Sequence, residues 1–132
     1  MAIEKIQYIA YPEAVFLHIE VMRFCGETHF GVALPALIQS ALARPQQAAA
    51  YEHADLIRQA ATLCFGLIKN HPWVGGNKRT ATHVTEAFLL VNGWDLTASI
   101  EETVNLVLAI ESDQNSIDEI EAWYRQRVVQ IS

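Results

Sequence analysis

Residues 69–83 read KNHPWVGGNKRTATH, and this stretch decides how the chain is interpreted. Pro72 cannot continue the helix expected before it, because proline lacks a backbone donor and clashes with the preceding turn. Gly75 and Gly76 allow a sharp turn and a close approach of the backbone to another molecule. An apolar helical pattern begins at about Asn77. The stretch therefore predicts a tight loop that runs into the start of a helix.

The charges at the start of that helix point to an anion. A helix N-terminus offers unpaired N–H groups and the positive end of the helix dipole, which together favour a bound anion. Lys78 and Arg79 add two cations where acidic side chains would stabilise an isolated helix. At the other edge of the loop, the His71 imidazole can accept a proton from a hydroxyl near neutral pH. Each feature alone has an ordinary structural explanation, but their order favours a phosphate-binding loop with a base at its edge.

The rest of the chain predicts a single all-α domain over residues 1–132, with about six helices and neither linker nor repeat. The helix from about Ala54 to Asn70 has an apolar face too wide for a surface helix, so we expect it to be central. Ser99–Glu102 and Ser116–Glu119 are capping boxes that predict two further helix starts. The other expected helices run from about Pro12 to a cap at Gly26, from Leu34 to Pro45, and from Asn77 to Val91. The apolar pattern of the helix that starts at Ser116 includes Val128, and the segment 93–98 could be a short extended piece.

Composition narrows the class of protein. Hydrophobic residues make up 52% and charged residues 18%, which is typical of a compact domain and argues against disorder. The net charge of −6 counts against a direct nucleic-acid binder that neutralises phosphates. We expect neither a signal peptide nor a membrane span, and hence a cytoplasmic protein. Cys25 and Cys64 are expected to be buried free thiols in a reducing compartment.

The stretch HPWVGGNKRTA resembles the signature of the Fic/Doc superfamily, and more closely its Doc (death-on-curing) branch. That signature runs His, any residue, Phe, any residue, Asp or Asn, Ala or Gly, Asn, Lys, Arg. The segments LIQSALARPQ, LIKNHPW, FLLVNGWDL and IEAWYRQ are also similar to landmarks of the Doc branch, so the resemblance covers nearly the whole chain. It implies an all-helical Fic fold in which the motif loop, residues 71–79, joins two central helices.

The resemblance also implies a chemistry. Fic relatives transfer a nucleotidyl group from ATP to a protein hydroxyl, and they carry glycine and arginine where this chain has Lys78 and Thr82. Doc proteins carry lysine at the first of these positions, which is associated with transfer of the terminal phosphate. The chain thus looks like an ATP- and Mg²⁺-dependent protein kinase that modifies a Ser or Thr of a translation factor, of the elongation factor Tu type. It would be a toxin restrained in trans by an antitoxin protein.

The resemblance assigns roles to individual residues of the loop. His71 would be the catalytic base, and Trp73 replaces the phenylalanine of the family as an anchor in the core. The residues expected to bind nucleotide or phosphate are Gly75, Gly76, Asn77, Lys78 and Arg79, with Thr82 and His83 as possible borders of the site.

Gly75 departs from the family, which usually has an acidic residue or asparagine at this position. An aspartate there would help to hold Mg²⁺, so we expect no metal ligand from the loop itself and Mg²⁺ bound through the nucleotide phosphates. Glu52 and Asp55 are candidates to replace the missing acid, and Ala33–Leu34 stand where many relatives have an Arg–Asp pair. Two alternatives therefore stay open: a catalytically degenerate module that binds nucleotide or protein, and a protein adenylyltransferase.

Overall fold

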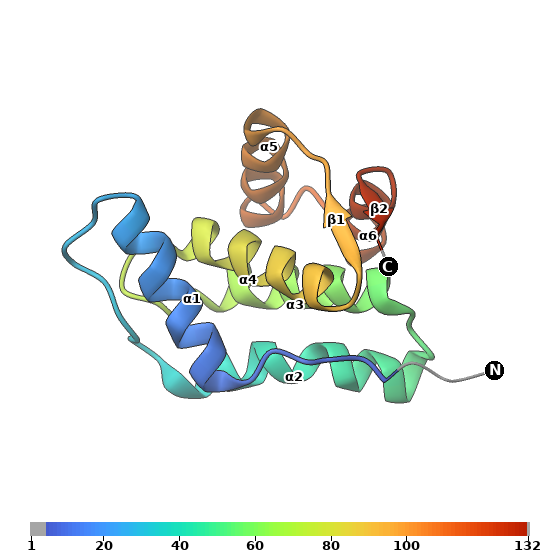
Figure 1. The fold of residues 1–132 in the computed structure, drawn as a ribbon, viewed down its shortest axis with the longest axis horizontal. Helices are drawn as coiled ribbons and strands as arrows, with labels where there is room; N and C mark the ends of the chain where they lie inside the picture. Colours follow the sequence, from blue (N-terminus) through green and yellow to red (C-terminus); the bar gives the residue numbers. More distant parts are fainter. Residues whose placement is uncertain (1–4, 132) are drawn as a thin grey trace.

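The computed structural model describes residues 5–131, and these form six helices and one two-stranded antiparallel sheet (Figure 1). The all-α prediction is confirmed. The helices are α1 (Tyr11–Phe24), α2 (Pro35–Glu52), α3 (Leu56–Asn70), α4 (Asn77–Val91), α5 (Ile100–Glu111) and α6 (Ile117–Arg125), and the strands are β1 (Trp94–Leu96) and β2 (Val128–Gln130).

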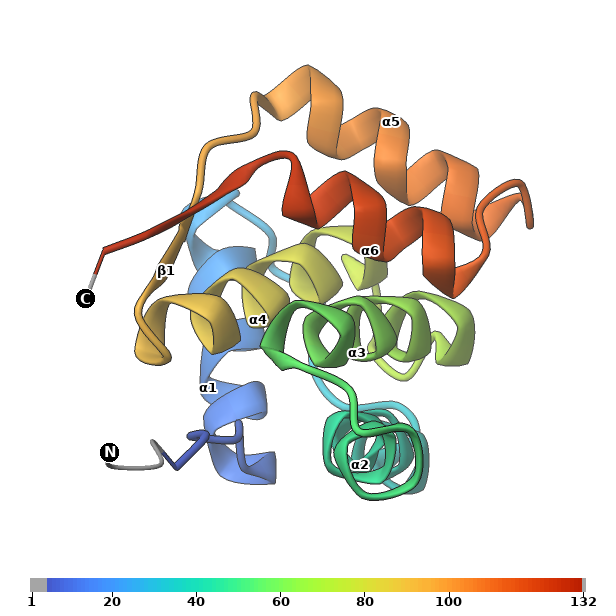
Figure 2. The ribbon, with the colours of Figure 1, turned by 90° about the vertical axis from the view of Figure 1, so that its right-hand side faces the viewer.

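The helices lie in three layers, with α3 and α4 side by side in the middle (Figures 1 and 2). Helices α1 and α2 cover one face of this pair, and α5 and α6 cover the other (Figure 2). Ten of the fifteen residues of α3 are buried, which confirms that it is the central helix. The loop that joins α3 to α4 is therefore anchored at both ends in the most buried part of the molecule.

Local signals set most helix ends where they were predicted. Helix α4 begins at Asn77 and ends at Val91. Both capping boxes form, with the Ser99 and Ser116 hydroxyls accepting N–H groups of the first turn. At the end of α1, Gly26 has a φ of 75°, and the next N–H donates to the Met22 carbonyl, as in a Schellman cap.

The sequence predicts that helix α2 ends at Pro45, but the helix continues to Glu52. A proline inside a helix removes one backbone hydrogen bond, so other interactions must stabilise α2 at Pro45. Its buried residues recur at helical spacing, and Pro45 itself is one of them: Ile38, Ala41, Pro45 and Ala48. Facing them, Gly66 of α3 allows a close approach, because a Cβ there would lie 3.3 Å from the Ala41 Cβ. Packing against α3 therefore outweighs the local effect of the proline.

Two further expectations need correction. Val128 does not belong to the last helix, because α6 ends at Arg125 and Val128 pairs with Leu96 in the sheet. This pairing confirms the extended piece within residues 93–98. Cys64 is buried as expected, but Cys25, the C-cap residue of α1, is exposed; both are free thiols.

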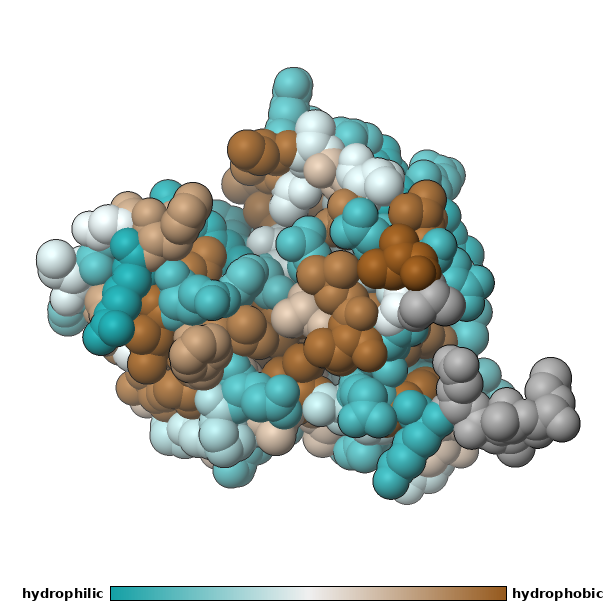
Figure 3. Space-filling view, in the orientation of Figure 1, coloured by the Kyte–Doolittle hydropathy of each residue, from teal (hydrophilic) through white to brown (hydrophobic). Residues whose placement is uncertain are grey.

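The surface mixes apolar and polar residues, and it is notched between the lobe of α1 with its following loop and the lobe of α5 (Figure 3). Among residues 5–131, no helix combines the length and the apolar character needed to cross a membrane.

Glu52 and Asp55 cannot replace an acid in the motif loop, because they lie at the opposite end of α3. This helix has fifteen residues, so its two ends are about 22 Å apart. Glu52 pairs with Arg58, 3.2 Å away. Asp55 caps α3 by accepting the Arg58 N–H and binds Arg125 of α6 through both carboxylate oxygens. Both carboxylates thus fasten the junction of α2, α3 and α6.

The Asp55 contacts should make stability depend on pH. Burial raises the pKa of this carboxyl, but hydrogen bonds from the Arg58 N–H and from Arg125 outweigh burial, and the net pKa lies below 3.8. The stabilisation is therefore present above pH 3.8 and is lost as the pH falls through the lower pKa of the folded state. An Asp55→Asn variant should be less stable than the parent at pH 7, and urea unfolding should show that this difference narrows towards pH 3.

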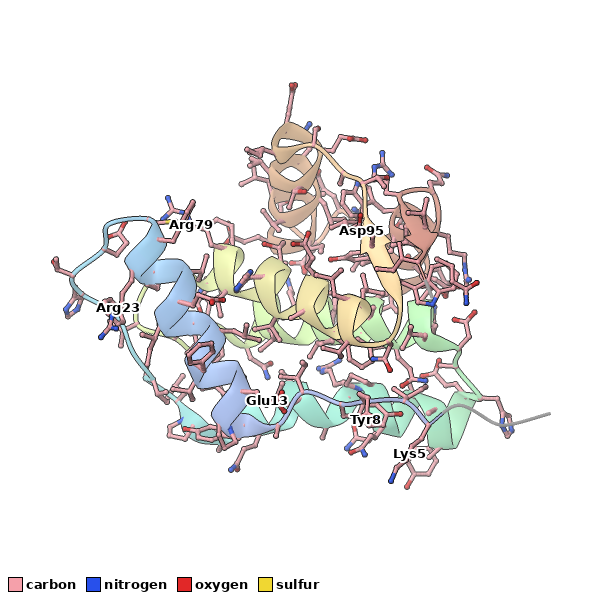
Figure 4. All side chains as sticks on the ribbon, in the orientation of Figure 1. Lys5, Tyr8, Glu13, Arg23, Arg79 and Asp95 are labelled. Atoms are coloured by element: carbon pink, nitrogen blue, oxygen red, sulfur yellow. The ribbon has the colours of Figure 1, made fainter. Side chains whose placement is uncertain are left out.

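Asp95 provides the matched control, because it is exposed on β1 and has no ion pair among residues 5–131 (Figure 4). Asp95 helps to raise the pKa of Glu86 above 4.5, so Asp95→Asn should leave the pH dependence unchanged only below pH 3.8, where Glu86 is already protonated. A constant difference between the parent and Asp55→Asn across this pH range would contradict the assignment.

Candidate phosphate-binding site

The motif loop is held in place by the segment that precedes α2. The Val74 N–H donates to the Gly31 carbonyl, 2.8 Å away, and the Pro72 carbonyl accepts two N–H groups from Ala33 and Leu34, each at 3.0 Å. Ala33 and Leu34, which stand in place of the Arg–Asp pair of many relatives, thus contact the loop through their backbone. Residues 31–34 therefore act as a strap across the loop.

The loop is closed on itself by Asn77. Its side-chain oxygen accepts the Trp73 N–H at 3.0 Å, and its side-chain nitrogen donates to the Trp73 carbonyl at 3.0 Å. These two bonds join the start of α4 to the beginning of the loop. In this conformation the Asn77 amide shapes the loop, and contact of its remaining N–H with phosphate stays a prediction.

The glycine pair turns the backbone so that its N–H groups remain available. Gly75 and Gly76 have φ values of 71° and 62°, in the left-handed region that favours glycine. Gly76 is also the N-cap of α4, and no side chain caps this helix. Within residues 5–131, no hydrogen bond uses the N–H groups of residues 75–79. The loop and the first turn of α4 thus offer a run of unpaired donors, which is the arrangement that binds phosphate.

A buried aromatic pair lies beneath the loop. Trp73 and His18 of α1 stack with ring centroids 4.3 Å apart, and both are buried. The His18 Nε2 accepts the Gly31 N–H at 3.1 Å, so in the neutral ring Nδ1 carries the proton and donates to the Thr80 hydroxyl at 2.8 Å. Burial lowers the pKa of His18, which favours this neutral form. His18 therefore connects the strap, the loop and α4, and Trp73 is an anchor in the core as expected.

The candidate base stands at the exposed edge of the loop. His71 caps the end of α3 in a left-handed conformation, with a φ of 46°, and its side chain is 52% exposed. A non-glycine residue rarely adopts this conformation, and such strained residues cluster at functional sites. The backbone thus directs the imidazole to a place where an incoming hydroxyl can reach it.

Glu111, the last residue of α5, joins the two sides of the site. Its Oε2 lies 3.4 Å from the His71 Nε2 and 3.3 Å from the Lys78 Nζ. The next turn adds an ion pair between Asp113 and Lys69, the latter near the end of α3. Figure 1 shows α5 standing across α4 with its C-terminal end towards that helix. The turn after α5 therefore lies against the motif loop and places a carboxylate beside its histidine and lysine.

Two of the remaining predicted residues, Arg79 and His83, lie on the side of α4 that faces α1. Arg79 lies beside the C-terminal end of α1 and pairs with Glu27 at 3.6 Å (Figure 4). His83 binds Glu20 of α1 at 2.9 Å. The Thr82 hydroxyl donates a hydrogen bond to the backbone of its own helix, at the Arg79 carbonyl oxygen 3.0 Å away. Lys78 and Arg79 thus adjoin the N-terminus of α4, while His83 and Thr82 lie one turn further along.

Glu111 and His18 are the contributors that sequence reasoning missed. A signal for Glu111 was present, because a negative charge in the last turn of a helix opposes the helix dipole. The cations at the start of α4 are likewise unfavourable, because they lie at the positive end of that helix dipole. The fold places Lys78 beside Glu111, so that the two opposite charges pair. His18 gave no comparable signal, since a buried histidine within an apolar helix has no distinguishing neighbours in the sequence.

The donors and charges fit a nucleotide phosphate chain accompanied by Mg²⁺. Among residues 5–131, no group of three or more His, Cys, Asp or Glu side chains is arranged to hold a metal ion. Mg²⁺ does not need such a group, because it keeps several waters and is bound through phosphates plus one or two carboxylates. The unpaired N–H groups of the loop with Lys78 and Arg79 suit the phosphates, and Glu111 is the carboxylate next to them.

Fold and site together define an all-helical domain whose central helices are joined by an anion-binding loop with a histidine at its edge. A profile of the Fic/DOC family matches residues 8–89, which include this loop. The Toxin Doc of Mycolicibacterium smegmatis is 35% identical to the chain, and the match covers 77% of this chain and 87% of that relative. The chain therefore belongs to the Fic/DOC family, and the family resemblance read from its sequence is confirmed.

The two glycines of the loop should tolerate substitution differently. At Gly75 an added Cβ would lie 3.7 Å from the nearest atom, the His29 carbonyl oxygen, so Gly75→Ala costs only backbone strain. At Gly76 the Cβ would overlap the Met22 side chain, whose Cε would be 2.8 Å away, and Met22 is buried. Urea unfolding should show Gly76→Ala to be less stable than Gly75→Ala by about 1–3 kcal/mol.

Met22→Ala removes the overlapping atoms and so tests whether the Met22 side chain causes the lower stability of Gly76→Ala. In this background the added penalty of Gly76→Ala should shrink, which a double-mutant cycle measures. Equal stabilities of the two single glycine variants would show that Met22 does not constrain Gly76.

Proposed function

We propose that the chain transfers the terminal phosphate of ATP to a Ser or Thr hydroxyl of a translation factor of the elongation factor Tu type. One observation carries the proposal: unpaired N–H groups, Lys78 and the His71 imidazole converge at the start of α4. Phosphoryl transfer depends mainly on positioning and charge stabilisation, with one residue to orient the nucleophile. The loop provides a group for each of these tasks.

In this reaction the substrate hydroxyl oxygen attacks the γ-phosphorus and the bond from that phosphorus to the β–γ bridging oxygen breaks, releasing ADP. His71 accepts the hydroxyl proton, which its exposed position at the loop edge allows. Lys78, Arg79 and the N–H groups of the loop hold the phosphates and stabilise the charge that develops on them. Mg²⁺ supplies further neutralisation of the phosphate charge when it is bound with the nucleotide.

Lys78 favours this reaction over adenylyl transfer. It stands at the position where nucleotidyl-transferring Fic proteins have glycine, and Thr82 stands in place of their second arginine. Threonine has no charge to offer a phosphate, and the Thr82 hydroxyl donates instead to the backbone of its own helix.

A role as a toxin follows from the relative named Toxin Doc. We propose that a separate antitoxin protein restrains the chain and that both act in the cytoplasm. An antitoxin helix laid in a groove of the Fic fold is one way to achieve this restraint. The notch beside α5 is a place of suitable form (Figure 3).

The proposal is tested by the intact mass of elongation factor Tu after incubation with the chain, ATP and Mg²⁺. A gain of one phosphoryl group is expected, and His71→Ala should abolish it because the base is lost. His53→Ala is the matched control, since His53 also caps a helix in a left-handed conformation, with a φ of 55°, but lies before α3, away from the loop. This variant should keep full activity. A gain of an adenylyl group would contradict phosphoryl transfer.

Gly75 underlies the second candidate function, a module that binds nucleotide without turnover. The φ of 71° at Gly75 is a conformation that aspartate tolerates better than most residues, and the space around it is open. A Gly75→Asp variant should therefore fold and add a carboxylate to the loop. If the parent is an active enzyme, the same mass assay should show the parent and the variant both to be active. Activity in Gly75→Asp alone would identify the natural chain as the binding module.

A further inference from the structure

We propose that Glu111 supplies the carboxylate for the divalent cation that accompanies the nucleotide, in place of an acidic residue in the motif loop. The inference rests on the proposed function, and it assigns the cation site to a side chain of α5. Its ligands would be the Glu111 carboxylate, the phosphates and water.

The contacts of Glu111 place it where such a ligand is needed. Its Oε2 is within 3.4 Å of both the candidate base and the phosphate-binding lysine, so the carboxylate lies at the mouth of the loop. The side chain is 36% exposed, and among residues 5–131 no hydrogen bond uses its Oε1, so this oxygen is free of competing partners. The ion pair of Asp113 with Lys69 fixes the turn that follows α5. The carboxylate is therefore held at the site by contacts on both sides.

The position of this charge is unfavourable for α5 itself. A glutamate in the last turn of a helix faces the negative end of the helix dipole. In the free protein Lys78 offsets this cost through an ion pair of 3.3 Å, and the His71 Nε2 lies 3.4 Å from the same carboxylate oxygen. The ion pair is half-exposed, so it is weak and can be exchanged for another. A nucleotide can thus take Lys78 from Glu111 without a large loss of stability.

Once phosphates occupy the loop, the carboxylate needs a cation. Negative phosphates beside an unneutralised Glu111 would repel it. A divalent cation between them turns this repulsion into attraction, and carboxylate and phosphate oxygens are the ligands that Mg²⁺ prefers. Residues 71–79 contain no Asp or Glu, so no carboxylate of the loop competes with Glu111 for the cation.

Glu27 is the other carboxylate that pairs with a motif cation, and it serves as the control. It lies 3.6 Å from Arg79, on the side of α1, and no histidine among residues 5–131 forms an ion pair with it. The two glutamates have similar exposure but face different cations of the loop. Only Glu111 touches both the base and a phosphate ligand.

The test measures binding of a non-hydrolysable ATP analogue by calorimetry, with Mg²⁺ and with EDTA. The parent should bind more tightly with Mg²⁺, and Glu111→Gln should reduce that preference by about tenfold or more. Glu27→Gln should leave the preference unchanged. The double variant Gly75→Asp/Glu111→Gln should restore it, because a carboxylate returns to the site from the loop. Circular dichroism melting of each variant checks the fold, which the substitution of the half-exposed Glu111 should not disturb.

The outcomes separate this inference from the function on which it rests. An unchanged Mg²⁺ preference in Glu111→Gln would overturn the inference while leaving nucleotide binding intact. Tighter binding by Glu111→Gln with and without Mg²⁺ would also overturn it, since Glu111 would then be a competitor of the phosphates. A parent that binds no nucleotide in either condition would overturn both the inference and the proposed function.

Discussion

The site depends on a stacked pair of buried rings, His18 and Trp73. Their contact fixes the base of the motif loop against α1, and the two nitrogens of His18 hold the strap and the first turn of α4. This arrangement requires a neutral imidazole, because Nε2 must accept the Gly31 N–H, and burial favours that form by lowering the pKa. With its core side fixed, the loop can leave its outer N–H groups unpaired without collapsing.

The electrostatics of the site follow from helix ends that are charged against their own dipoles. Helix α4 starts with two cations and without a side-chain cap, and α5 ends with a glutamate. Each arrangement is locally unfavourable, and each is relieved by the other once the fold brings these ends together. The resulting cluster is half-exposed, so its charges stay available to a ligand. Such local conflicts in a sequence are expected at functional sites.

The parts predicted from sequence are those that local chemistry controls. Pro72 and the glycine pair define the loop, and capping residues define the ends of several helices. Helix α2 ran past Pro45 because its packing against α3 is a tertiary effect that no local rule contains. The partners of the loop were missed for a related reason: His18 and Thr80 are 62 residues apart, and Lys78 and Glu111 are 33 apart. Only the assembled fold brings such residues together.

The placement of Glu111 on α5 has a consequence for the order in which the site is completed during synthesis. Helices α1 to α4, the strap and the loop all precede α5 in the chain. Because a single domain folds as a unit and α5 and α6 cover one face of the central helices, the loop reaches its final form only after Glu111 has also been made. The carboxylate is therefore beside the loop from the moment the site is assembled. A chain terminated after α4 contains the residues of the loop but lacks both their acidic neighbour and the cover of the central helices.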